Sequence, residues 1–205
     1  MIEGYILSII LSMAVLTFFN IILKRNDTKN KFKVRWQHYL FGYIFMLYLV
    51  ISLKDIVGFP VLSDLERVIM SGRSIFYPVL NFIPFSSGIE ISSILNIIFF
   101  MPFGFLLPTL WKEFRSFLPT VLVGFLFSLI IEVGQLFTIR ATDVDDLIMN
   151  TLGTALGFIV FKLASKIFKN ISSKTVFEVH NKKCSIIKYG PYLYILIAII
   201  SVFLS

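Results

Sequence analysis

The residues best suited to chemistry lie in one short stretch, between positions 132 and 150. It holds Glu132, Arg140, Asp143, Asp145 and Asp146, in a chain of which only 15% of the residues are charged. A charge near hydrocarbon is costly unless it is paired or faces water, so ionisable residues in an apolar chain are functional candidates. The cluster predicts where a functional site lies, although it names no reaction.

The composition of the chain predicts a polytopic membrane protein. Hydrophobic residues make up 57% of the sequence and the mean hydropathy is +0.87, more apolar character than a soluble core of this size can bury. We expect a single membrane domain over residues 1–205 without a separate soluble domain, because no linker rich in Pro, Gly or Ser divides the chain. The single cysteine excludes an internal disulfide framework and a thiolate metal site.

The apolar segments predict an all-α bundle of about six transmembrane helices. These helices are expected over residues 4–23, 36–53, 91–110, 116–139, 147–161 and 189–205, and Lys162 and Lys166 can complete the span of the fifth by reaching the inner headgroups. The loops 24–35 and 162–188 are rich in Lys and Arg, which predicts that they are cytoplasmic and that both termini lie outside the plasma membrane. The net charge of +7 is therefore an orientation signal, and we expect no binding to nucleic acid.

The long outer connection between residues 54 and 90 contains two predicted features. Residues Ser63 to Glu66 have the form of a capping box, and Gly72 can end the short surface helix that would follow. Pro78 and Pro84 break the apolar stretch after it. Segment 81–85 is therefore predicted to be an interfacial or re-entrant loop before the third transmembrane helix.

The fifth predicted helix, if it begins near Asp143, has a polar upper part and a close-packing lower part. Five residues share one face at about 100° per residue: Asp143, Asp146, Asn150, Gly153 and Gly157. The two glycines predict close packing against the fourth helix. Asp145 falls on another face and is predicted to point to solvent.

The candidate ligand-binding residues lie on the third, fourth and fifth helices and on the loops beside them. They are Asn81, Asn96, Glu132, Gln135, Arg140, Asp143, Asp146 and Asn150. Two structural explanations compete with binding. Carboxylates in a first turn can merely compensate a helix dipole, and Glu132 can form a buried structural pair with Gln135, Asn150 or Arg140. The acids also suit Ca²⁺ or Mg²⁺, but their spacing matches no metal motif, so we expect neither a metal ion nor another cofactor.

Several of these residues fall in segments that resemble the VanZ-like family of bacterial membrane proteins. The matching segments are NFIPF (81–85), NIIFFMPFGFLLP (96–108), SLIIEVGQLF (128–137), Arg140 with Asp143, and DDLIMNTLG (145–153). They occur in the family's order and at about its spacing, within a family-like core of about residues 36–168. The resemblance implies a multipass plasma-membrane protein. The name-giving member is an accessory resistance factor against teicoplanin, a glycopeptide antibiotic, and the family has no settled reaction.

Two functions of different classes follow. The first is a non-enzymatic cell-envelope factor of a Gram-positive type, whose outward site binds membrane lipid, a lipid-linked cell-wall precursor or a lipoglycopeptide antibiotic. Arg140 would contact an anionic group of that ligand. The alternative is a membrane enzyme acting on a lipid-linked phosphate or glycan, with Glu132, Asp146 and Arg140 as catalytic candidates. The sequence has no nucleophile elbow, paired-His motif or P-loop, and the absence of these catalytic motifs favours the first function. The sequence leaves the oligomeric state open.

Overall fold

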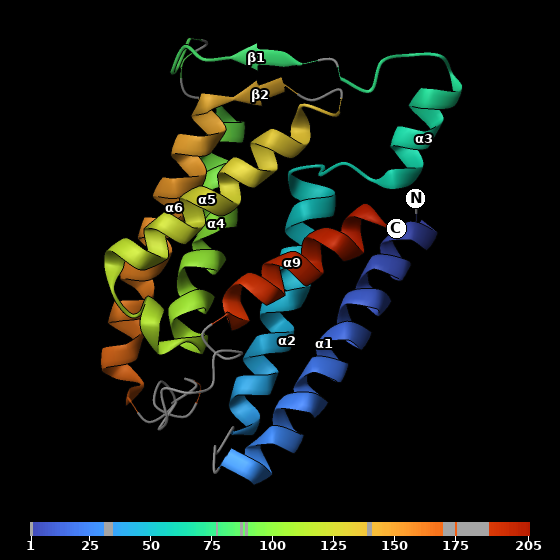
Figure 1. Cartoon of the computed structure of the whole chain (residues 1–205). Coiled ribbons are helices and arrows are strands. Elements are labelled where there is room, and N and C mark those ends of the chain that lie inside the picture. The colour runs from blue at the N-terminus through green and yellow to red at the C-terminus, as the bar shows by residue number, and fades with distance from the viewer. Residues whose placement is uncertain are drawn as a thin grey trace.

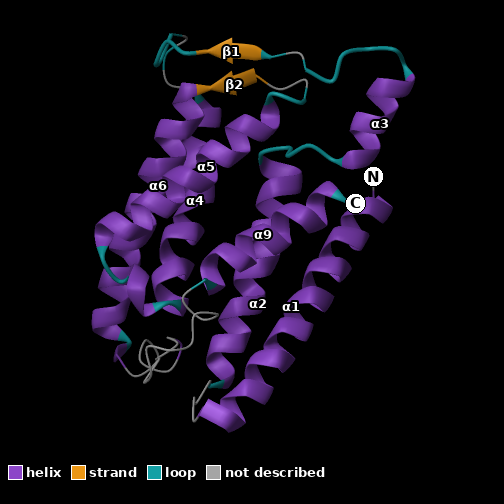
Figure 2. Ribbon diagram, viewed as in Figure 1, coloured by secondary structure: helices purple, strands orange, loops and turns teal. Residues whose placement is uncertain are grey.

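The structure is a computed structural model that describes residues 2–30, 35–76, 78–86, 88, 90–138, 141–169, 175 and 189–205. In this part of the chain seven α-helices account for almost all regular structure, and each of the two strands has only three residues (Figures 1 and 2). The predicted all-α helical bundle is confirmed.

Five of the described helices are long and apolar enough to cross a membrane. They are α1 (Ile2–Asn30), α2 (Trp36–Ile51), α4 (Ile91–Leu110), α5 (Phe117–Gln135) and α6 (Val144–Ile167). The last helix, α9 (Gly190–Phe203), begins with Pro191 in its first turn, as predicted, but has only 14 residues. It is about 21 Å long at 1.5 Å per residue, which is shorter than the hydrocarbon core of about 30 Å. The expected count of six spans is therefore approximate. The chain is a multipass membrane protein.

The helices form two groups, α1 with α2 and α9, and α4 with α5 and α6 (Figure 1). Aromatic side chains join the two groups in the core. The ring of Phe45 on α2 lies 5.7 Å from that of Phe103 on α4 and 6.2 Å from that of Tyr194 on α9. The Tyr48 hydroxyl also donates a hydrogen bond of 2.9 Å to the Phe99 carbonyl of α4. The α4–α5–α6 group is therefore packed against the α1–α2–α9 group through these contacts of α2.

The backbones of α4 and α6 are in direct contact. A β-carbon added at Gly153 or Gly157 of α6 would collide with main-chain oxygen atoms of α4, and one added at Gly104 of α4 would collide with the backbone at Thr154. The glycines thus lie against α4, which corresponds to the third predicted transmembrane helix. The sequence pattern had predicted packing against the fourth, which corresponds to α5. The reason is that α6 contacts both neighbours, and Thr154 rather than a glycine meets Gly124 of α5.

Three helix termini lie between residues 51 and 72, and two of them differ from the prediction. A π-helical turn, η1 (Ser52–Ile56), extends α2 beyond its predicted end. Helix α3 (Leu62–Met70) has Val61 as its N-cap without a side-chain hydrogen bond, so the capping box predicted at Ser63 is wrong. The Val61 carbonyl instead accepts the first helical bonds from Asp64 and Leu65, which starts the helix earlier. Gly72, with a φ of 70°, follows the end of α3 as predicted.

A thin layer covers the ends of α4, α5 and α6. Strand β1 (Val79–Asn81) pairs in parallel with β2 (Ala141–Asp143), which places Asn81 opposite Asp143. Figures 1 and 2 show this strand pair lying across the upper ends of α4, α5 and α6. A short 3₁₀ turn, η2 (Lys112–Phe114), lies at the opposite end, between α4 and α5. The strand pair brings the 81–85 segment onto the start of α6.

Candidate functional site

The start of α6 is the centre of the candidate site. Asp143 is the N-cap of this helix, and its Oδ1 accepts a hydrogen bond of 2.9 Å from the backbone N–H of Asp145. This use of an aspartate satisfies a donor that the helix itself leaves unpaired. The other oxygen, Oδ2, accepts a bond of 3.0 Å from the side-chain amide of Asn81. Asp143 therefore joins β1, β2 and α6.

Glu132 connects the end of α5 to the same point. Its side chain is buried, with 4% of its surface exposed, and its Oε2 accepts a bond of 3.0 Å from the backbone N–H of Asp143. The Thr142 hydroxyl donates to the Glu132 carbonyl at 3.3 Å. The predicted pairs of Glu132 with Gln135 and Asn150 do not form, because a main-chain donor of β2 takes the carboxylate instead.

Asp145 corrects a prediction. The helical repeat placed it toward solvent, but it is only 8% exposed, and both of its oxygens accept from the backbone N–H of Phe85, at 2.8 and 3.1 Å. Its face of α6 is covered because the loop after β1 folds back over the start of the helix. Phe85 has a φ of 55°, a conformation that residues other than glycine rarely adopt. Asp145 thus holds an unfavourable turn in place over the site.

A further polar contact lies beside Asp143, and another lies one helical turn below it. The side-chain amide of Asn96 on α4 donates to Asp146 Oδ1 at 2.5 Å. One turn down α6, the amide of Asn150 donates to the hydroxyl of Ser128 on α5 at 2.9 Å. Asn150 is buried, and its Oδ1 has no hydrogen-bond partner in the described structure. The polar stripe of α6 is therefore inserted between α4 and α5.

Gln135 stands apart from this network. Gln135 is buried and its amide donates to the Val57 carbonyl at 2.9 Å, which ties α5 to the end of η1 rather than to the acids. Its Oε1 is also buried without a partner among the residues described. Arg140 lies outside the described residues, so its place relative to Glu132 stays a prediction.

The geometry gives no sign of a metal centre in the part of the chain that is described. There, no group of three or more His, Cys, Asp or Glu side chains could hold a metal ion. The carboxylates of Asp143 and Asp145 are instead engaged by backbone and amide donors, as the distances above show. Within these residues the arrangement can orient a ligand through fixed acceptors.

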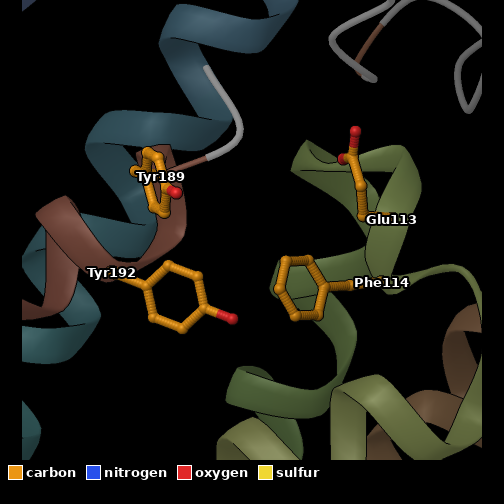
Figure 3. Close-up of a pocket in the computed structure, with 4 residues that line it drawn as sticks. All are labelled: Glu113, Phe114, Tyr189 and Tyr192. Carbon is orange, nitrogen blue, oxygen red and sulfur yellow. The ribbon is translucent and has the colours of Figure 1, made fainter. Parts of the chain in front are cut away.

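A hollow of a different kind lies at the opposite end of the bundle. It has a volume of about 420 Å³ and is lined by Glu113, Phe114, Tyr189 and Tyr192. Figure 3 shows the Tyr192 ring directed toward Phe114, and the two ring centres are 6.4 Å apart. No candidate from the sequence lines this hollow. It lies between η2 and the start of α9, and we assign it no role in the polar site.

The fold and site together define a polytopic helical membrane protein whose polar residues are gathered at one end of a three-helix group. A family model described as VanZ/LLP1 matches residues 6–165, and the chain belongs to this family. It is similar to Protein VanZ of Enterococcus faecium, with 37% identity over 108 residues that cover 52% of this chain and 66% of that protein. No solved structure matches the chain.

Asp145 and the Phe85 amide are the site groups that sequence reasoning missed. Residues 81–85 and 145–153 both stood out in the sequence, yet their contact depends on a strand pair of only three residues. So short a pairing has no periodic signal of its own. The parallel pairing at Asn81 and Asp143 could be found only once both segments were placed in space.

Asp145→Ala is expected to loosen the turn at residues 83–86. The variant leaves the Phe85 amide without its acceptor, and the loss of a hydrogen bond to a charged group costs about 1.5 to 3 kcal/mol. Hydrogen exchange followed by mass spectrometry should show faster exchange in a peptide that covers this turn. Asp64→Ala is the matched control, because Asp64 forms only an exposed ion pair with Arg67 on α3. Unchanged exchange at Phe85 would contradict the assigned role.

Proposed function

We propose that this protein is a cell-envelope factor of the teicoplanin-resistance type, which binds a membrane-associated ligand at its polar end without transforming it. The family and the similarity to Protein VanZ support the type of function. One structural observation carries the proposal. Candidate residues from α4, α5, α6 and the strand layer form hydrogen bonds between these elements at one end of the bundle. Such a preorganised polar surface suits recognition.

The ligand class follows from the groups that remain available. Gln135 Oε1 and Asn150 Oδ1 are buried acceptors without partners in the described structure, and a ligand hydroxyl or amide could satisfy such groups. Arg140 would contact a phosphate or carboxylate, since a guanidinium binds such anions well. We propose an anionic envelope lipid, a lipid-linked cell-wall precursor or a lipoglycopeptide as the ligand. The proposal depends most on Arg140, because carboxylates alone would repel an anion.

The site is proposed to face outward at the plasma membrane, with both termini on the same side. Support comes from the Lys- and Arg-rich segments 24–35 and 162–188, which include the last turns of α1 and of α6, at the end of the bundle away from the strand layer. Basic loops of this kind favour the cytoplasmic side. The strand layer would then lie where envelope precursors are exposed.

Antibiotic susceptibility tests this function. Wild type, Arg140→Ala and Asp146→Asn would be expressed at matched membrane levels in a sensitive Gram-positive host and challenged with teicoplanin and vancomycin. Wild type is expected to raise the inhibitory concentration of teicoplanin, and both variants to lose most of that increase. Leu163→Ala is the control, because Leu163 is an exposed apolar residue of α6 far from the strand layer. Variants that protect as well as wild type would rule out the polar site.

The second candidate function is that of a membrane enzyme acting on a lipid-linked phosphate or glycan. It is favoured by one observation, that Glu132 uses only Oε2 in hydrogen bonding within the described residues. The second oxygen could accept a proton from a substrate. Purified protein would be assayed with polyprenyl phosphates, with and without Mg²⁺. Turnover that Glu132→Gln abolishes would establish the enzyme, and no turnover would leave the binding function.

A further inference from the structure

The turn after β1 presents an apolar tip, defined here as residues 82–85, beside the polar layer. Phe82 is 70% exposed and Ile83 is 69% exposed, and Pro84 and Phe85 are exposed as well. Single exposed apolar residues are ordinary, but a contiguous group of large ones indicates an interaction surface. The tip therefore calls for an apolar partner that lies outside the described fold.

The tip is held in this exposed position by polar contacts at its base. Asp145 binds the Phe85 amide through both oxygens, and Asn81 binds Asp143. The positive φ of Phe85 shows that the chain takes an uncommon conformation here. Conformations of this kind persist only where the surrounding structure fixes them. The exposure of Phe82 and Ile83 is thus a feature that the fold maintains.

Helix α3 carries a second apolar surface. None of its residues is buried. Leu62, Leu65 and Ile69 share one face at the helical repeat, while Asp64 and Arg67 lie on the other and pair at 3.0 Å. A short helix with such strongly separated faces and no buried side chain is typical of one that lies in a membrane interface.

We propose that the tip and the apolar face of α3 insert into the membrane leaflet next to the polar layer, so that their partner is a lipid surface. Chain continuity favours lipid over a protein partner. The tip leads within a few residues into α4, whose first turns expose Ile91, Ile94 and Ile98 along a membrane-spanning helix. The exposed apolar surface is therefore shared between the tip and a helix that hydrocarbon must cover. A ligand with an apolar tail would reach the polar layer from the leaflet.

Single fluorescent probes test this insertion independently of antibiotic resistance. In a Cys184→Ser background, which removes the only cysteine, the probe NBD would be attached to Ile83→Cys or Ile69→Cys. The protein would be reconstituted into vesicles of phosphatidylcholine and phosphatidylglycerol containing acyl-chain doxyl lipid. We expect blue-shifted emission and strong quenching at both sites, similar to a Leu163→Cys reference. An Arg67→Cys probe, on the polar face of α3, should show neither.

The opposite result is equally well defined. A probe at residue 83 that is quenched by aqueous iodide, and no more by doxyl lipid than the probe at residue 67, would overturn the proposal. The tip would then be free for a protein partner or a second copy of the chain. Circular dichroism of each labelled variant would verify that the helical content is retained. Loss of teicoplanin protection bears on the proposed function alone and does not alter this outcome.

Discussion

Gly157→Val is expected to destabilise the protein by about 3 kcal/mol or more. Gly157 lies so close to α4 that even a β-carbon would collide with the main chain at Met101. A backbone cannot move aside as the end of a flexible side chain can, so α4 and α6 would have to separate. Overpacking of a close-packed interior usually costs about 1 to 3 kcal/mol, and a rigid main-chain neighbour places this site at the upper end.

The effect can be measured by unfolding in detergent micelles with a denaturing detergent, followed by helical content and by the fraction of intact protein after gel filtration. Leu156→Phe is the control, because it enlarges a neighbouring side chain of α6 that is already 37% exposed. Its stability should stay within about 0.5 kcal/mol of wild type. Equal stability of the Gly157 variant and this control would show that α4 and α6 are not in backbone contact.

Glu132→Ala is expected to weaken both the fold and the function, whereas Glu132→Gln should separate the two. Alanine leaves the Asp143 N–H without its acceptor between α5 and β2, which costs about 1 to 3 kcal/mol for a buried group. Glutamine retains an acceptor oxygen and removes the charge. The glutamine variant should therefore stay close to wild type in stability but lose teicoplanin protection if the carboxylate serves the ligand.

Unfolding and antibiotic susceptibility would be measured on the same three proteins at matched membrane levels. A glutamine variant that protects fully would show that Glu132 has only a structural role in joining α5 to β2. An alanine variant as stable as wild type would contradict the structural role itself. The pair thus tests the explanation of Glu132 as a buried structural residue against its place in a binding site.

The periodic features of the chain could be read from the sequence because they depend on local chemistry. The start and end of α4 at Ile91 and Leu110 follow from an uncharged and mainly apolar segment. The start of α6 follows from Asp143, whose short side chain caps the helix directly. The α3 cap at Ser63 was wrong because the helix begins two residues earlier, where the carbonyl of the extended Val61 accepts from Asp64 and Leu65. The N-terminus of a helix thus depends on the conformation of the residues before it as well as on the capping motif.

The sequence alone determined the membrane bundle, the family, and the stretch that carries the polar candidates, because hydropathy and motif spacing are properties of the linear chain. Only the tertiary structure decided which groups meet. It turned Asp145 from solvent toward the Phe85 amide, directed Gln135 to Val57, and placed the α6 glycines against α4. These contacts join segments far apart in the chain. They depend on helix rotation and on one strand pair, neither of which any local pattern fixes.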